Sequence, residues 1–303
     1  MLRDHRGARS EADALVKEAT RLTSPSLWAM RLKGDWAQAT PLFERAALLY
    51  RQVGDYSAAK NCWTRAADGH KAQNSPWHAA KVLERAGEAA QQDGNWAEVE
   101  SLFHQASELY LLEDRPQNAA ECIVRGAKAL ENVSKAEKIL KMYSKALEWL
   151  EDSGKDVMGM DVYREAIRFA VDKELWNQSH RLLLRFAAVC ARSRALNSLC
   201  KSYLGATVVC LYDCQFTEAW STHQDALEVE EFAVSEEARA AAALLHAYGN
   251  GDEQGIKSCI KERACFFHME PSLARLAKRL PNGEIGAAVA ALNATVEEEE
   301  DLT

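Results

Sequence analysis

The chain has 303 residues, of which 48% are hydrophobic and 27% charged, and its formal net charge is −8 at pH 7. The longest apolar runs, such as residues 240–245 and 285–292, are far shorter than the roughly 18 residues that a membrane-spanning helix needs. Residues 1–6 lack the apolar stretch of a secretory signal. These features exclude a membrane-spanning chain, and we expect a cytoplasmic protein.

The N-terminal region is predicted to hold one helix and one loop. Residues 1–10 match no pattern, so we expect a disordered extension, and the first helix is placed at residues 11–22. Residues 22–30 contain Ser and Pro and are predicted to form a loop. Leu27 and Trp28 lie in this loop, and Trp is favoured at lipid boundaries. The loop is therefore expected either to touch a membrane or to fold back onto the first helix pair.

From residue 36 onward the chain follows a repeat of 20 residues. One column of the repeat holds mostly large apolar residues: Phe43, Trp63, Leu83, Phe103, Ile123, Tyr143, Tyr163, Leu183, Tyr203 and His223. The column three positions later is mostly small: Ala46, Ala66, Ala86, Ala106, Gly126, Ala146, Ala166, Phe186, Ala206 and Ala226. Residues three apart share one face of a helix, and a small side chain lets a neighbouring helix approach closely. Each repeat is therefore predicted to be one helix and its turn.

A further apolar column, four residues before the large one, supports this phase: Ala39, Ala59, Ala79, Val99, Ala119, Ile139 and Ala219. Turn residues such as Gly54-Asp55 and Gly94-Asn95 fall between the repeats. The predicted helices run near residues 36–52, 56–72, 77–91, 96–112, 117–131, 135–152, 158–172, 175–191, 195–211 and 215–229.

The fold class that follows is all-α. We expect a right-handed α-solenoid of antiparallel helix hairpins, similar to tetratricopeptide repeats, with about 14 helices in all. The solenoid would occupy residues 11–230, a C-terminal helical bundle residues 231–296, and an acidic tail residues 297–303.

No motif of a known enzyme class is present in the sequence. It has no phosphate-binding loop, no Gly-x-Ser-x-Gly and no His-Glu-x-x-His, so we expect neither catalysis nor a cofactor. An unrecognised enzyme stays an alternative, and a deep pocket with converging titratable groups would indicate one. Cys210, Cys214 and His223 could be drawn as a zinc site, but their spacing is unusual, and buried reduced thiols are the preferred interpretation.

Charge is distributed unevenly. Residues 1–150 carry 21 Lys and Arg against 20 Asp and Glu, while residues 151–303 carry 16 against 25. One column of the repeat is mostly basic: Arg45, Arg65, Arg85, Gln105, Arg125 and Lys145. Because alternate helices of a solenoid line opposite walls, Arg45, Arg85 and Arg125 are predicted to form a row on one wall and to bind an elongated acidic ligand. The alternative is that each Arg pairs with a local acid such as Glu44 or Glu84.

The C-terminal residues combine charge with one apolar side chain. Five consecutive acids, residues 297–301, precede Leu302. Such a run is usually solvated, but an apolar residue beside it suggests a short linear motif that docks on a basic partner.

The segment Gly34-Asp35-Trp36-x-x-Ala39 and its recurrence at Gly54-Asp55-Tyr56-x-x-Ala59, with the motif at residues 300–303, resemble the soluble NSF attachment proteins. Trp28 in the first loop, where the alpha branch has a pair of Phe, is more similar to the gamma branch.

The resemblance implies an adaptor that coats SNARE four-helix bundles and recruits the hexameric ATPase NSF for their disassembly in membrane fusion and vesicle-mediated transport. It implies that Leu27 and Trp28 touch the membrane, that the concave-face basic residues, here Arg45, Arg85 and Arg125, contact the SNARE bundle, and that Leu302 with its neighbours Glu300 and Asp301 acts on NSF. Peripheral membrane association and no nucleic-acid partner are expected. A generic peptide-binding repeat scaffold is the alternative.

Overall fold

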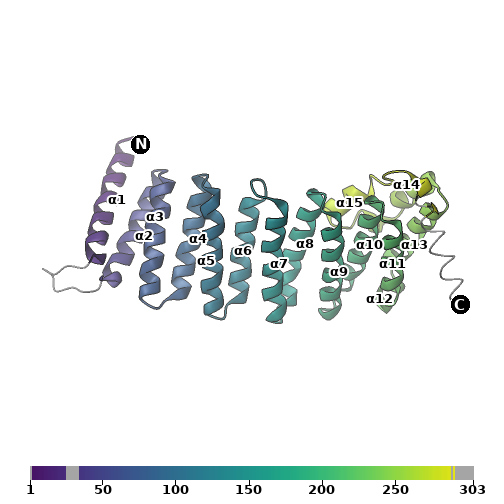
Figure 1. Ribbon diagram of the computed structural model, residues 1–303, viewed down its shortest axis with the longest axis horizontal. Coiled ribbons are helices and arrows are strands. Elements are labelled where there is room, and N and C mark those ends of the chain that lie inside the picture. Colours follow the sequence, from purple (N-terminus) through teal and green to yellow (C-terminus); the bar gives the residue numbers. More distant parts are fainter. Residues whose placement is uncertain (1, 25–33, 288, 291–303) are drawn as a thin grey trace. The chain divides into compact units, whose positions relative to one another are not determined.

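The computed structural model describes residues 2–24, 34–287 and 289–290, and every regular element among them is helical, which confirms the all-α prediction (Figure 1). The chain divides into two compact units, Met1–Gly154 and Lys155–Thr303. The predicted boundary near residue 230 falls inside the second unit, where the helices become short.

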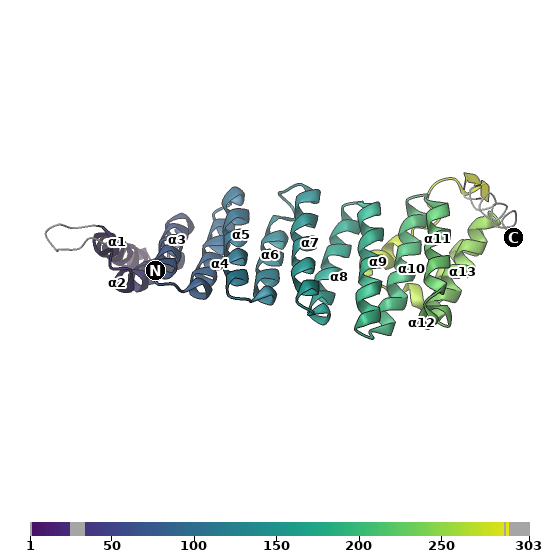
Figure 2. The ribbon, with the colours of Figure 1, turned by 60° about the horizontal axis from the view of Figure 1, so that its bottom comes forward.

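The first unit is a row of helices in which each helix packs against the next (Figures 1 and 2). Its elements are α1 (Leu2–Thr23), α2 (Trp36–Gln52), α3 (Tyr56–Ala72), α4 (Pro76–Gln92), α5 (Trp96–Leu112), α6 (Pro116–Leu130) and α7 (Ala136–Asp152). The helix predicted at residues 11–22 is too short at its N-terminal end, because α1 already begins at Leu2 and so includes residues of the expected extension.

The turns repeat with the same period as the helices. Residues with positive φ lie on a 20-residue spacing that is missing only at position 134 between residues 54 and 214: Gly54, Asn74, Gly94, Asp114, Gly154, Glu174, Arg194 and Cys214. After the first of these, the backbone N–H of Asp55 donates to the carbonyl of Tyr50 at 2.9 Å, a bond that closes the helix end. The Asp55 side chain then accepts the N–H of Ala58 and caps the next helix. The short segment at residues 53–55 thus ends α2 and starts α3.

The core of both units is built from the predicted columns. All members of the small column are buried, as are all members of the large column except Tyr203, which is half-buried. The prediction that these faces lie between successive helices is therefore confirmed. Phe103 illustrates the fit: a Cβ added at Gly87 of α4 or at Gly126 of α6 would lie 2.9 Å from its side chain. Both neighbouring helices thus approach α5 closely enough to need glycine.

The second unit begins as the same kind of row and then becomes irregular. Its helices are α8 (Asp156–Asp172), α9 (Trp176–Arg192), α10 (Leu196–Tyr212), α11 (Phe216–Leu227), α12 (Glu230–Ala233), α13 (Glu236–Gly249), α14 (Glu253–Glu262) and α15 (Pro271–Ala277), with the 3-10 helix η1 (Ala264–Phe266).

Helix α10 is the centre of the second unit. It packs against α9, α11, α12, α13 and α15, and its residues 204–212 are all buried. The chain returns after α14 so that α15 lies against α8 and α10. Gly205 of α10 permits this approach, because a Cβ there would lie 2.9 Å from Leu273 Cδ1 of α15. The returning segment thereby forms one wall of a pocket.

Candidate functional site

The predicted arginine row lies on alternate helices of the first unit. Arg45 is on α2, Arg85 on α4 and Arg125 on α6, and each side chain is about half exposed or more, at 66%, 46% and 46%. The three guanidinium groups therefore lie one hairpin apart in sequence and remain accessible from solvent. Their placement on a common wall stays a prediction.

Each of these arginines also forms an ion pair with an acid on an earlier helix of the same unit. Arg45 is ion-paired with Glu11 of α1, and Arg85 Nη1 lies 4.0 Å from Glu44 Oε2 of α2. Arg125 is bound more tightly, by Glu84 of α4 and by Glu88 at 3.1 Å. Burial lowers the pKa of Arg125, but the hydrogen bond and charge of Glu84 outweigh it, so the pKa is raised. The arginines thus pair with local acids, as the alternative interpretation predicts. Their side chains are also exposed, as ligand binding requires.

The other two basic members of the column have different surroundings. The Arg65 guanidinium lies 5.2 Å from the ring of Phe43 and donates to Thr23 Oγ1 at 3.3 Å. Lys145 Nζ lies 3.2 Å from His104 Nε2 and 5.2 Å from the ring of Trp149. Among the described residues, these two cations therefore have aromatic rings, a hydroxyl and an imidazole as partners, and the rings stabilise them.

The remaining predicted site residues lie outside the described residues. They are Leu27 and Trp28 in the first loop and Glu300, Asp301 and Leu302 near the C-terminus.

The expectation of buried thiols holds for six cysteines but is wrong for Cys214, which is exposed, and Cys259 is half-buried. Burial raises the pKa of Cys210 to about 12, and the Cys214 thiol contacts the carbonyl of Asn282 at 3.4 Å. His223 is 4% exposed and faces the ring of Phe232. Within the described part of the chain, no group of three or more His, Cys, Asp or Glu is placed to hold a metal ion. Over the same residues, no helix is both long and apolar enough to cross a membrane.

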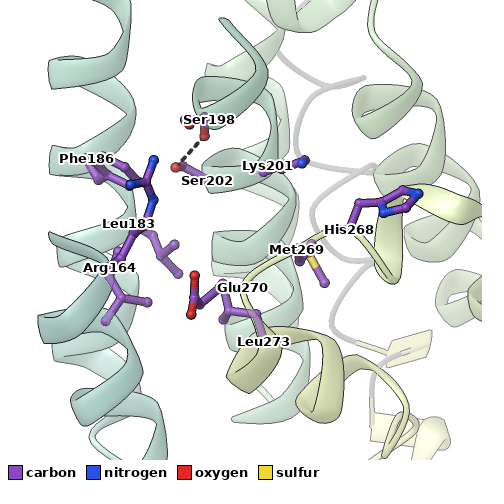
Figure 3. Close-up of a pocket in the computed structure, with 11 residues that line it drawn as sticks. Arg164, Leu183, Phe186, Ser198, Lys201, Ser202, His268, Met269, Glu270 and Leu273 are labelled. Carbon is purple, nitrogen blue, oxygen red and sulfur yellow. Dashed lines mark hydrogen bonds between the residues drawn. The ribbon is translucent and has the colours of Figure 1, made fainter. Parts of the chain in front are cut away.

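A pocket that sequence analysis missed lies in the second unit (Figure 3). It has a volume of about 190 Å³ and is bounded by α8, α9, α10 and the segment that leads into α15. Leu183, Phe186 and Leu273 give it an apolar side. The sequence offers one signal for this region, a basic stretch near residues 275–279 within an acidic half of the chain.

Charged groups surround the apolar side of this pocket. Arg164 of α8 and Lys201 of α10 line it, together with His268, and Arg164 also donates to Asp161 at 2.5 Å. Glu270 is the acid that lines it; burial raises the pKa of this carboxyl, and the charge of Arg164 acts against that rise. In Figure 3 the Glu270 carboxylate lies near Leu183 and the Arg164 guanidinium lies beside Phe186, whereas Lys201 and His268 lie farther from these residues. Arg164 Cζ is 5.9 Å from the centre of the Phe186 ring, so the apolar side also carries one cation and one acid, and two further basic side chains lie apart from it.

These features define a class of protein, a helical-hairpin repeat protein with a row of accessible basic side chains. Comparison with known sequences specifies it further. The profile of the family described as "Soluble NSF attachment protein, SNAP" matches residues 10–269, and the chain belongs to that family.

Two curated relatives carry the name gamma-soluble NSF attachment protein. The one from Arabidopsis thaliana is 33% identical over 97% of this chain and 99% of its own length. The one from Dictyostelium discoideum is 25% identical over 89% of this chain and 82% of its own.

Among solved structures, similarity extends to BtubC from P. vanneervenii (TM-score 0.40, 14% identity, 75% of this chain and 91% of that one). It also extends to the apo quorum sensor NprR from B. thuringiensis (TM-score 0.35, 14% identity, 98% and 83%).

Proposed function

We propose that the protein is an adaptor that binds SNARE four-helix bundles, recruits the NSF ATPase and stimulates it, so that the bundles are disassembled in vesicle fusion and intracellular protein transport. The observation that carries this proposal is the family match over residues 10–269. The name of the two relatives, NSF attachment protein, agrees with it. In this role the protein would be cytoplasmic, would associate peripherally with membranes, and would need no catalysis, cofactor or metal of its own.

The arginine row is the proposed contact for the SNARE bundle. Arg45, Arg85 and Arg125 are accessible and belong to successive hairpins, so an elongated acidic ligand could engage them together. Exposed ion pairs contribute only about 0–1 kcal/mol, so the carboxylates of a ligand can replace the local acids at little cost. Reversing Arg45 and Arg85 to Glu should weaken binding and flatten its dependence on salt. Unchanged binding at physiological salt would favour a structural role for these pairs.

The tail is the proposed contact for the ATPase, and it provides the decisive experiment. The five acids at residues 297–301 would attract a basic surface, and Leu302 would enter a small apolar pocket. Burying one Leu side chain contributes about 1.5–3 kcal/mol, so Leu302→Ala should raise the adaptor concentration needed for half-maximal ATPase stimulation about tenfold or more. Neutralising the five acids should instead weaken recruitment in a salt-sensitive manner.

The assay is ATP hydrolysis by purified NSF with a preassembled SNARE bundle, with bundle binding measured in parallel by pull-down. Leu302→Ala should leave bundle binding and folding unchanged. The parallel pull-down on the same variant is therefore the control for loss of folding or of bundle binding. Full stimulation by a chain truncated after Val296 would contradict the proposed role of the tail.

A further inference from the structure

A basic segment interrupts the acidic C-terminal half of the chain. Residues 151–303 carry 16 Lys and Arg against 25 Asp and Glu. Within them, residues 263–280 carry four Lys and Arg against one acid, Glu270. This segment contains η1, α15 and the pocket wall formed by His268, Met269 and Leu273. None of these four Lys and Arg side chains lines the pocket itself. The basic groups that do line it are Arg164, Lys201 and His268, against the single acid Glu270, so the lining can attract an acidic ligand.

The pocket offers two chemically different subsites. Leu183 and Leu273, with Phe186, form an apolar surface that could accept a side chain such as Leu (Figure 3). Lys201 lies beside Ser202 on α10, away from Leu183 and Phe186, and its ammonium group forms no ion pair with the residues that the structure describes. A ligand that fits both subsites is a short peptide segment in which acidic residues adjoin one apolar residue.

We propose that this pocket binds the acidic segment of the same chain, residues 297–302, with Leu302 against Leu183 and Leu273 and the acids toward Lys201 and His268. The sequence of the segment, five acids followed by Leu, has both required components. Glu270, near the apolar end, repels the acids. Arg164 at the same end is already paired with Asp161, which leaves Lys201 and His268 for the acids.

The chain is long enough for this contact. Val289 is close to Gly251 at the C-terminal end of α13, 3.4 Å from the position of a Cβ there, and α13 packs against α10, which lines the pocket. The same segment of the chain also touches the end of α10, because a Cβ at Gly283 would lie 2.8 Å from the Cys214 thiol. Lys201 is 13 residues before Cys214, about 20 Å along that helix, and a helical path from residue 283 to residue 290 adds about 10 Å, so the pocket lies about 30 Å from residue 290. The residues between 290 and 302 can span about 40 Å when extended.

The contact would mask the segment that is proposed to act on NSF. This consequence rests on the proposed function, whereas the contact itself does not. A docked segment would be unavailable to the ATPase until a competing basic surface displaced it. The tether between residues 290 and 302 has an r.m.s. length of about 20 Å, shorter than the distance from residue 290 to the pocket, so tethering favours the docked state less than a linker of matched length would. The contact must therefore be correspondingly tight to keep the segment docked.

The test is a competition measured by fluorescence anisotropy, with a labelled peptide of residues 293–303 and the full-length chain. The reference variant has the four Glu at 297–300 changed to Gln and Asp301 to Asn, which disables the tethered competitor without shortening the chain. We expect this variant to bind the peptide at least tenfold more tightly than the wild-type chain does. Equal affinity for both chains would overturn the proposal.

Pocket variants in the same background locate the site. Lys201→Glu should weaken peptide binding about tenfold and Glu270→Gln should strengthen it. Lys257→Glu on α14, a charge reversal away from the pocket that also breaks the pair with Glu253, should leave peptide binding unchanged. A role of these residues in folding alone would not produce opposite signs for Lys201 and Glu270. If Lys201→Glu and Lys257→Glu act alike, the peptide binds elsewhere and the proposal is wrong. The assay contains neither ATPase nor SNARE proteins, so its failure leaves the proposed adaptor function intact.

Discussion

Replacing Gly126 by Ala is a sensitive test of the close helix packing in the first unit. The new Cβ would lie 2.9 Å from Phe103 Cβ, 3.1 Å from Cγ and 3.2 Å from Met142 Cε. Phe103 Cβ is fixed to the backbone of α5 and cannot rotate away, so the helices must separate. Overpacking of this kind costs about 1–3 kcal/mol, whereas Ala gains about 1 kcal/mol of helix propensity over Gly. We expect Gly126→Ala to be destabilised by up to about 2 kcal/mol.

Two other glycines serve as controls. At Gly87 the nearest atom is Phe103 Cε2 at 2.9 Å, in the outer part of a buried ring that can shift slightly, so Gly87→Ala should be destabilised less than Gly126→Ala. Gly7 of α1 has no atom within 4 Å of its added Cβ, so Gly7→Ala should be stabilised by up to about 1 kcal/mol. Thermal unfolding followed by circular dichroism measures these differences in stability. A change of about 1 kcal/mol in the free energy of unfolding shifts Tm by about 2–4 °C. If Gly126→Ala raises Tm as much as Gly7→Ala does, the close packing against Phe103 is refuted.

Three further predictions use other parts of the chain. Gly69→Ala should lower Tm, because its Cβ would collide with Thr40 Oγ1, which donates to Trp36 O at 2.7 Å; an unchanged Tm would count against that packing. Leu27→Ser with Trp28→Ser should reduce liposome flotation and slow disassembly of liposome-borne SNARE bundles, and no change would remove the membrane role of the loop. Burial lowers the pKa of His223 from 6.5, so unfolding takes up a proton and stability should fall as pH drops below about 6.5. His223→Gln should reduce the difference between urea midpoints at pH 7.5 and 5.5, and an equal difference would show that other groups cause it.

The regular part of the fold was predictable because its determinants are local and periodic. Predicted and observed helix bounds agree within two residues from α2 to α11, even at turns whose left-handed residue is Glu174, Arg194 or Cys214. No turn-forming residue marks those three positions, but the buried columns on either side fix their place. Helix α1 was predicted too short because residues 2–10 carry no apolar stripe, and burial periodicity detects only helices that pack.

The pocket was not predictable for the opposite reason. Its lining joins Arg164 to Glu270, more than 100 residues later, and the segment that holds Glu270 has left the 20-residue repeat. No local sequence pattern indicates that α15 packs against α8 and α10. In the structure Gly205 allows α15 to approach α10. From sequence alone, however, a glycine inside a helix does not show which element packs against it.

The arginine row combines a stabilising role with a proposed binding role, and its ion pairs predict how the two are divided. A ligand carboxylate that engages Arg85 displaces only a contact of 4.0 Å, and Glu44 keeps His70 as a partner at 2.8 Å. A ligand at Arg125 must compete with two closer carboxylates, from Glu84 and Glu88. Arg85→Gln should therefore weaken binding of the SNARE bundle more than Arg125→Gln, whereas Arg125→Gln should lower Tm more than Arg85→Gln. The measurements are bundle binding over a range of salt concentrations and thermal unfolding of the same two variants. If both orders are reversed, the local acids do not decide which arginine contacts the ligand, and position along the row decides it instead.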